Sequence, residues 1–397
     1  MAVRVYLKQA WNLMKQNPLF STLYIVGTGI SIVMTMVIAI VYYVRLAPVY
    51  PETNRMRTLV VKSAKMTNDE STHSANISYA MLKDWFYSLE SAEVSTGVSG
   101  TSYARVTNDK EEIPTYARYT DENFFRVFPL VFLEGKPFTE ADRRSGIHNV
   151  VLTDSYAQQL FGTTKGVVGK NFLMDYTNVK VVGVVKSGSF LTPDSYAQVY
   201  LPYSCRDGYD DEGSHWALGG YRVYILMKES KSVTDVQDEV LELVRKFNVS
   251  DMGDGWKLDL VGQPELYWHS TFRLWSNVAV DWGRVIWMFV GIFMVLLFVP
   301  AFNLSGMISA RMERQLPDLG IRKAFGASRR RLLVQIIWEN LLLTGLGTLL
   351  GLVIAWIVLA LSGYEIFSLF EVFPKFPPKG VNLGMGIDCL LYTSPSP

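Results

Sequence analysis

The chain of 397 residues carries 38 Lys and Arg against 37 Asp and Glu, and this formal net charge of +1 gives no indication of nucleic-acid binding through bulk positive charge. Apolar residues make up 49% of the chain and charged residues 19%, below the roughly 25% of soluble domains, so part of the chain is expected to lie in lipid. Two cysteines, Cys205 and Cys389, are too few for a disulfide framework or a cysteine-rich metal site.

The N-terminal region predicts a cytoplasmic helix followed by a membrane span. Residues 1–18 have an amphipathic pattern and include basic but no acidic residues. Residues 19–45 are predicted as transmembrane helix 1, because the stretch from Leu19 to Val44 has no charged residue and about twenty apolar residues suffice to cross the hydrocarbon layer. A secretory signal peptide is disfavoured, since its apolar region would be only about 7 to 15 residues long.

Residues 46–281 are predicted to form an exported α/β domain. The basic segments 1–18 and 309–331 are both assigned to the cytoplasm by the positive-inside rule, so the long segment between the first two spans lies on the other side. Hydrophobic periodicity and turn residues predict its elements. These are helices at 154–161 and 233–247, strands at 179–185 and 221–227, and surface loops at 97–102 and 207–220. Thr234 and Gln237 are expected to form a capping box for the second helix.

No catalytic, cofactor or metal site is predicted in this domain. The four histidines lack the spacing of a zinc site and are expected to be structural or exposed; they are His73, His148, His215 and His269. No Gly-x-Ser-x-Gly nucleophile motif occurs. The chain is therefore not expected to be an enzyme.

Two further spans are predicted after the exported domain. Residues 282–308 form transmembrane helix 2, which contains Pro300, and residues 336–362 form transmembrane helix 3. Gly347 and Gly351 form a small-xxx-small pair that lets two membrane helices approach closely. Ordinary helix packing within one chain is the simpler interpretation of this pair.

Residues 309–335, between these two spans, are predicted to form a cytoplasmic connection of helix, turn and helix. Pro317 and Gly326 are expected to bracket a short helix from Asp318 to Phe325, and Ser328 is expected to cap the next helix. The apolar residues of such a short helix need cover from lipid or from another protein. The basic residues of the region favour either an acidic protein partner or anionic lipid headgroups.

The segment 309–335 contains a run of residues that matches a known signature: Glu313, Arg314, Gly320, Ile321, Arg322, Lys323, Ala324, Gly326, Ala327, Ser328, Arg329 and Arg330. In this run the segment resembles the coupling region of the MacB-like and FtsX-like family of ABC-transporter permeases. In the exported segment, residues 124–139, 149–162, 168–170 and 181–185 are similar to the MacB-type periplasmic core domain. Asp318 and Leu319 replace the common Glu-Ile, and Phe325 replaces Leu.

The resemblance implies an α/β extracytoplasmic domain inserted between the first and second helices of a transmembrane bundle in the bacterial inner membrane. It implies a homodimer or heterodimer of permeases with a cytoplasmic ABC ATPase subunit that binds the ATP, and a periplasmic adaptor and outer-membrane channel as further partners. Six residues are the candidates for ATPase coupling: Glu313, Gly320, Arg322, Lys323, Gly326 and Ala327. The expected function is export or extraction of a substrate that the sequence does not specify.

An alternative role is that of an FtsX-like regulatory membrane protein that relays the state of the ATPase to a periplasmic partner. A transporter would show ligand-stimulated ATP hydrolysis, whereas a regulator would bind an exported protein and move no solute.

The family has four spans, and residues 363–397 are predicted to hold an extracytoplasmic loop and a truncated or non-native tail in place of the fourth.

Overall fold

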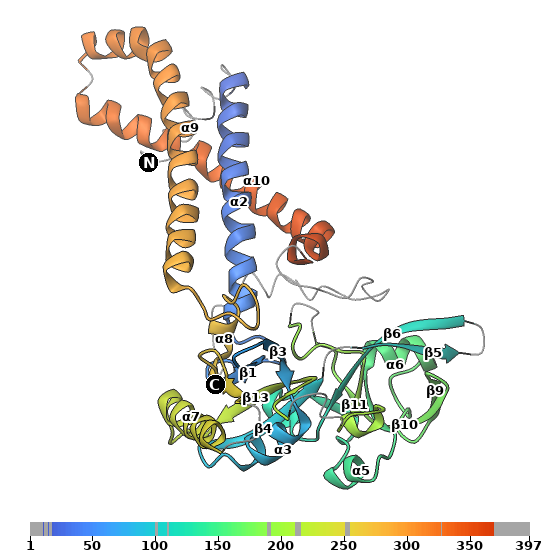
Figure 1. The fold of residues 1–397 in the computed structure, drawn as a ribbon. Coiled ribbons are helices and arrows are strands. Elements are labelled where there is room, and N and C mark those ends of the chain that lie inside the picture. The colour runs from blue at the N-terminus through green and yellow to red at the C-terminus, as the bar shows by residue number, and fades with distance from the viewer. Residues whose placement is uncertain are drawn as a thin grey trace. The chain divides into compact units, whose positions relative to one another are not determined.

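The computed structural model describes residues 11, 15, 18–99, 102–108, 111–188, 192–210, 216–250, 255–326 and 328–368. Contacts divide these residues into two compact units (Figure 1). A helical unit holds residues 18–43 and 282–368, and an α/β unit holds residues 44–281. The tail and most of the N-terminal helix predicted from the sequence lie outside the described residues.

The helical unit is built from three long helices: α2 (Pro18–Leu46), α9 (Trp282–Ala324) and α10 (Arg329–Ser368). Among the described residues, two segments are long and apolar enough to cross a membrane, Ser21–Leu46 and Leu332–Leu359. The apolar segment of α9, Trp282–Phe298, is shorter than that threshold. The expectation of three spans therefore stays a prediction.

The prediction that a short helix begins at Asp318 is wrong. Helix α9 runs without interruption from Trp282 to Ala324 and contains both Pro300 and Pro317. Proline removes one backbone hydrogen bond and bends a helix, but helical geometry can resume on both sides of it. The ribbon of α9 changes direction before it ends (Figure 1). Pro317 therefore lies within the helix and does not begin one.

The α/β unit contains two sheets. Strands of the first sheet pair antiparallel in the order β14-β2-β3-β13-β1-β15, with β4 on β13 and β12 on β3. Their bounds are β1 (Thr58–Val61), β2 (Ala64–Thr67), β3 (Thr72–Ile77), β4 (Ala92–Ser99), β12 (Leu218–Gly219), β13 (Tyr221–Met227), β14 (Lys257–Asp259) and β15 (Glu265–Leu266). The first sheet thus combines chain segments from both ends of the unit.

The second sheet has the order β7-β10-β8-β11-β6-β5-β9, with parallel pairs β8–β10 and β6–β11. Its strands are β5 (Ser102–Asn108), β6 (Glu111–Thr120), β7 (Phe132–Gly135), β8 (Asn149–Thr153), β9 (Asn171–Met174), β10 (Thr177–Val185) and β11 (Val199–Pro202). Because β9 pairs with both β5 and β10, six of these strands close into a ring. The second sheet is formed entirely by the middle of the unit.

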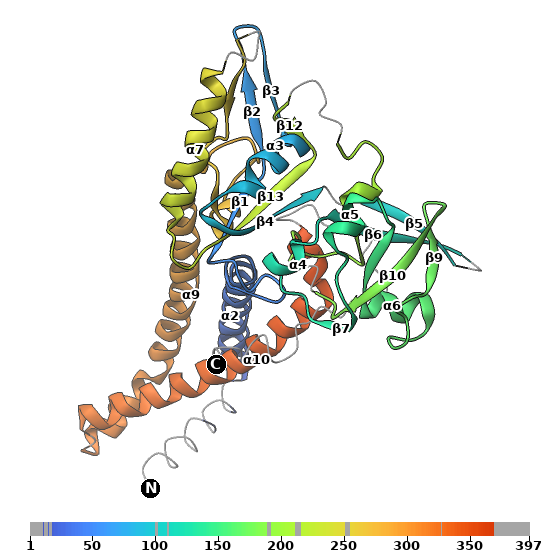
Figure 2. The same ribbon diagram turned by 90° about the horizontal axis from the view of Figure 1, so that it is seen from below.

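Helices of different lengths lie around the two sheets (Figure 2). They are α3 (Tyr79–Asp84), η1 (Phe86–Ser88), α4 (Phe124–Val127), α5 (Glu140–Arg144), α6 (Asp154–Phe161), η2 (Tyr203–Cys205), α7 (Val233–Val249) and α8 (Tyr267–Ser270). The predicted helices 154–161 and 233–247 and strands 179–185 and 221–227 are confirmed. The capping box of α7 is formed by Ser232 and Asp235, so the prediction that placed it at Thr234 and Gln237 is wrong.

The predicted loop 97–102 is wrong at its first residues, because β4 extends to Ser99. A Cβ at Gly97 would lie 2.2 Å from a methyl carbon of Leu82, so the absence of a side chain at Gly97 makes room for α3 against the sheet. This glycine permits close packing and does not mark a turn.

Asp121 connects the two sheets through five hydrogen bonds. Its carboxylate accepts from Tyr87 Oη at 2.6 Å and from Thr96 Oγ1 at 2.7 Å. Backbone N–H groups complete the set at distances of 2.8 to 3.2 Å, and they belong to Gly97, Asn123 and Phe124. Burial raises the pKa of Asp121 to about 6 although these hydrogen bonds act to lower it.

Candidate functional site

The residues proposed for coupling lie in the last part of α9 and in the turn that follows it: four belong to α9, and Gly326 and Ala327 come after its end. Helix α9 ends at Ala324, and the N–H of Phe325 still donates to Ile321 O at 3.0 Å. Gly326 follows with φ +89°, and its N–H donates to Lys323 O at 3.0 Å. A left-handed glycine directly after the last helical residues is a common way to end a helix. The predicted role of Gly326 as the end of this helix agrees with this geometry.

Helix α10 begins directly after this turn. Its first residue is Arg329, and the N–H of Leu332 donates to the carbonyl oxygen of Ser328 at 3.2 Å. Ser328 therefore occupies the position before the helix that the sequence predicted for it. Arg329 and Arg330 are exposed in the first turn of α10. Basic side chains therefore lie exposed just after the left-handed Gly326.

Large apolar side chains lie exposed at the end of α9. Phe325 is 89% exposed, and Ile321, four residues earlier on the same side of the helix, is 57% exposed. Glu313, Gly320, Lys323 and Gly326 are exposed as well. The side chain of Arg322, on α9, and the whole of Ala327 lie outside the described residues. The described part of the turn therefore combines uncovered apolar surface with charge, which is typical of a docking surface.

Alanine substitutions at Gly326 and Gly320 are expected to change the free energy of unfolding in opposite directions. Gly326→Ala is expected to lower the free energy of unfolding by about 1 kcal/mol, because an L-residue is strained at positive φ. Gly320→Ala, within α9 and with nothing within 4 Å of the added methyl group, is expected to raise it by about 0.5 to 1 kcal/mol. Thermal denaturation of the detergent-solubilised chain, followed by circular dichroism, measures both. Equal effects would contradict the turn geometry.

Gly347 and Gly351 of α10 lie against α2. A Cβ at Gly347 would lie 2.8 Å from Thr28 Cβ, and one at Gly351 would lie 2.7 Å from the carbonyl oxygen of Gly29. Tyr24 of α2 and Thr344 of α10 share a hydrogen bond of 3.0 Å beside this contact. The two glycines therefore let the backbones of α2 and α10 approach closely within one chain.

Gly29 is the part of this contact that the sequence analysis missed. It contributes its backbone from the opposite helix, and a Cβ on it would lie 3.3 Å from Gly347 O. The presence of Gly27 and Gly29 two residues apart in an otherwise apolar span could have predicted that another helix approaches α2 closely here.

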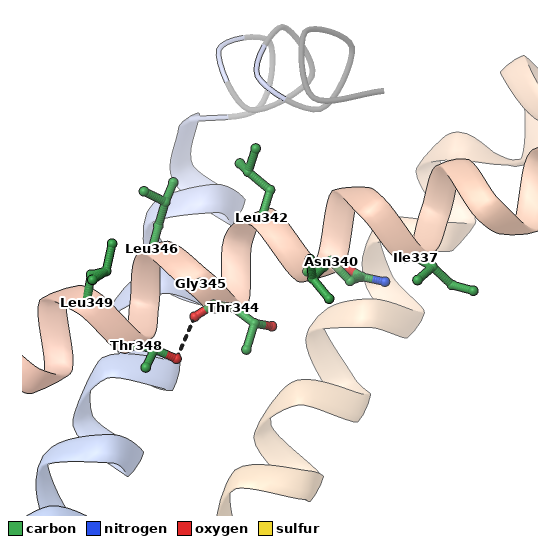
Figure 3. Close-up of a pocket in the computed structure, with 9 residues that line it drawn as sticks. Ile337, Asn340, Leu342, Thr344, Gly345, Leu346, Thr348 and Leu349 are labelled. Atoms are coloured by element: carbon green, nitrogen blue, oxygen red, sulfur yellow. Dashed lines mark hydrogen bonds between the residues drawn. The ribbon is translucent and has the colours of Figure 1, made fainter. Parts of the chain in front are cut away.

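Beside this contact, α10 forms an open, largely apolar hollow of about 850 Å³ that includes Thr344 (Figure 3). Its lining comes from one helix: Ile337, Asn340, Leu341, Leu342, Thr344, Gly345, Leu346, Thr348 and Leu349. Thr348 satisfies its hydroxyl by donating to Thr344 O at 2.8 Å. The hollow therefore offers little polar chemistry to a ligand.

The described residues contain no group of three or more His, Cys, Asp or Glu side chains that could hold a metal ion. Cys205 is a free thiol, and burial raises its pKa to about 12. It is therefore protonated at neutral pH and a poor nucleophile.

Comparison with known families finds two matches. Residues 20–243 match the MacB-like periplasmic core domain, and residues 277–393 match the FtsX-like permease C-terminal domain. The second match includes the turn between α9 and α10 and the glycines of α10.

Curated relatives include the macrolide export ATP-binding/permease protein MacB of Escherichia coli O157:H7 and of Escherichia coli K12. Each is 22% identical over 268 residues, which are 66% of this chain and 39% of the relative. The chain thus spans well under two thirds of the length of these relatives.

Similar solved structures include the periplasmic region of MacB from Actinobacillus actinomycetemcomitans and the extracellular domain of the noncanonic ABC-type transporter YknZ from Gram-positive bacteria. The first is 18% identical with a TM-score of 0.38, and it covers 51% of this chain and 88% of its own. The second is 16% identical with a TM-score of 0.35, and it covers 50% and 99%.

Proposed function

The chain belongs to the MacB-like family, with a periplasmic core domain and an FtsX-like permease domain, and on this premise we propose that it is the membrane subunit of an ABC transporter. It uses ATP hydrolysed by a separate cytoplasmic ATPase to move its exported α/β unit. This movement exports or extracts a substrate across the bacterial inner membrane.

The turn between α9 and α10 is the proposed contact with the ATPase. The observation that carries this proposal is the exposed pair Ile321 and Phe325 beside the basic residues of the turn, within the segment that matches the permease family. Apolar side chains supply the area that association buries, and charged side chains orient the partner. Gly326 ends the helix in the conformation that presents this surface, and the exposed residues Glu313 and Gly320 lie on the same helix before it.

Charge reversal in the last turn of α9 tests this contact. The double variant Arg322→Glu with Lys323→Glu is expected to lower the amount of ATPase that co-purifies with the chain at least tenfold, because both charges that face an acidic partner change sign. The measurement is co-purification of an affinity-tagged chain with the ATPase from detergent-solubilised membranes, with the amount of inserted chain quantified in parallel.

A matched control is present in the exported unit. Arg245 and Lys246 are adjacent, 69% and 70% exposed, and lie on α7. Reversing both to glutamate makes the same change in net charge and is expected to leave co-purification unchanged. Undiminished co-purification with the turn variant would overturn the contact.

A further inference from the structure

A short loop of the α/β unit carries uncovered apolar side chains. This apolar loop, residues 274–280, contains no charged residue. Leu274 and Trp275 are each 67% exposed, and Val278 is 46% exposed. Large apolar side chains that stand together in water usually mark a surface that a partner or a membrane covers. The apolar loop is therefore a candidate contact surface.

The apolar loop has a fixed shape, because a buried arginine holds its backbone. Arg273 pairs with Glu265 of β15, and the two side chains are 3% and 7% exposed. Its Nη1 donates to Val278 O at 2.7 Å, and its Nη2 donates to Val261 O at 2.9 Å. The N–H of Val278 donates to Trp275 O at 3.1 Å and closes a turn within the loop. The planar guanidinium thus connects the start and the end of the loop to β15.

Strand β15 is in turn fixed to the first sheet. Glu265 pairs with Val60 of β1. The side chain of Gln263, just before β15, accepts from the N–H of Lys62 at 2.6 Å and donates to Ser63 O at 3.0 Å. All these contacts lie within the α/β unit. The loop therefore presents its apolar side chains from an ordered base, and a preformed surface of this kind binds with little further loss of conformational freedom.

The covalent chain limits how far the apolar loop can lie from α9. Val278 precedes Trp282, the first residue of α9, by four residues. Four extended residues span at most about 14 Å, whatever the orientation of the two units. The apolar helix segment Trp282–Phe298 begins at this point. A headgroup layer of about 5 to 7 Å on each side of the hydrocarbon core is thus within reach of the loop if this segment enters lipid.

We propose that Leu274, Trp275 and Val278 form a membrane-binding surface of the exported unit, which inserts into the headgroup layer of the leaflet on the exported side. This inference rests on the proposed function, because it takes the apolar segment of α9 to enter the membrane. Tryptophan combines an apolar ring with a polar N–H and is favoured at this depth. Because the loop has no charge, its binding depends on buried apolar area and not on anionic headgroups.

Collision measurements on a spin label test this surface in the full chain, embedded in phosphatidylcholine nanodiscs. The label is placed at Ser276→Cys, an exposed position of the loop that leaves the three apolar residues intact, and Cys205 and Cys389 are replaced by serine. Oxygen concentrates in lipid, whereas the nickel complex of ethylenediaminediacetate stays in water. The ratio of the two collision rates therefore measures contact with lipid.

The reference position is Val249→Cys, which is 84% exposed at the end of α7. Its neighbour Asn248 bonds to Leu258 of β14, at the opposite edge of the first sheet from β15. The ratio at 276 is expected to be at least threefold higher than the ratio at 249. An equal ratio would show that water covers the loop, and collisions with neither reagent would show that protein covers it. Either result would overturn the proposal.

A charge placed in the loop gives a second test. Trp275→Asp is expected to lower the ratio at 276 at least twofold, because a carboxylate is unfavourable in lipid and draws the loop into water. Tyr176→Asp makes the same change at an aromatic residue that is 81% exposed between β9 and β10, and it is expected to leave the ratio unchanged. A lipid-like ratio that persists in Trp275→Asp would contradict insertion of this side chain.

A label at Ile286→Cys separates failure of this surface from failure of the proposed function. Ile286 is 59% exposed in the apolar segment of α9. A lipid-like ratio at 286 with a water-like ratio at 276 would overturn the membrane-binding surface alone. Water-like ratios at both positions would also contradict a membrane position for α9. In each case the ratio at 276 decides whether the loop contacts lipid.

Discussion

Replacing Gly351 by leucine is expected to push α10 away from α2 and to lower the free energy of unfolding of the helical unit by about 3 kcal/mol or more. The first added carbon would already lie 2.7 Å from Gly29 O and 2.8 Å from Ile32 Cβ, and backbone cannot move aside as a flexible side chain can. Overpacking of this kind costs about 1 to 3 kcal/mol in cores, and loss of the neighbouring Tyr24–Thr344 hydrogen bond adds to it. Thermal denaturation of the solubilised chain measures the effect.

Gly345 of the same helix is the control for this substitution. Nothing lies within 4 Å of a Cβ added there, and the residue is exposed. Gly345→Leu adds the same volume and helix propensity, and we expect it to leave the denaturation midpoint unchanged or to raise it. A similar loss with both variants would show that close approach of α2 is not what requires glycine at 351.

Asp121→Ala is expected to lower the free energy of unfolding of the α/β unit by about 3 to 5 kcal/mol at pH 7. The substitution removes the acceptor of three buried and two partly buried hydrogen bonds, and each buried unsatisfied group costs about 1 to 3 kcal/mol unless it finds another partner. Asp84→Ala, at an exposed aspartate of α3, is expected to change stability by no more than about 0.5 kcal/mol. Chemical denaturation followed by tyrosine and tryptophan fluorescence compares the two.

The pKa of Asp121 also predicts a dependence on pH. The ordinary value is 3.8 and burial raises it to about 6 in the folded state, so the folded chain binds a proton more readily than the unfolded chain. This contribution to stability is fully present below pH 4 and is lost as the pH rises from about 4 to about 6. Asp121→Asn cannot titrate, so the difference in stability between Asp121→Asn and the unaltered chain is expected to change over this pH range. A constant difference would contradict the raised pKa.

Local elements were predictable where local chemistry decides them. Helix α6 begins and ends at the predicted residues because Thr153 precedes it in an extended conformation and Gly162 ends it at φ +70°. Helix α7 buries the predicted face of Val236, Val240, Val244 and Phe247 because residues three and four apart share one side of a helix. Neither result depends on what the rest of the chain does.

The predictions that failed depend on distant parts of the chain. The Gly- and Ser-rich composition of residues 97–102 predicted a loop. Gly97 instead lies in β4, where Leu82 of α3 occupies the space that a side chain on Gly97 would need. Pro317 has the chemistry of a helix start, but α9 continues through it. Two other expectations for this segment did not depend on distant contacts. Gly326 is placed by its own backbone preference, and the exposure of Ile321 and Phe325 agrees with the expectation that apolar residues here lack cover within the chain.

The sequence by itself determined the apolar helices, the α/β character of the segment between them, the glycine that ends α9 and the resemblance to a permease family. Each of these follows from short-range periodicity, from the backbone preference of one residue or from a contiguous motif. Only the tertiary structure decided that β9 closes a ring of strands, that Gly29 meets Gly347 and Gly351, and that Glu52 and Arg55 connect the end of α2 to Ser195 and Tyr267. These contacts join residues that are distant in the chain, such as Thr107 with Leu173, Gly29 with Gly351 and Glu52 with Tyr267, and such pairings are not encoded in the spacing of neighbouring residues.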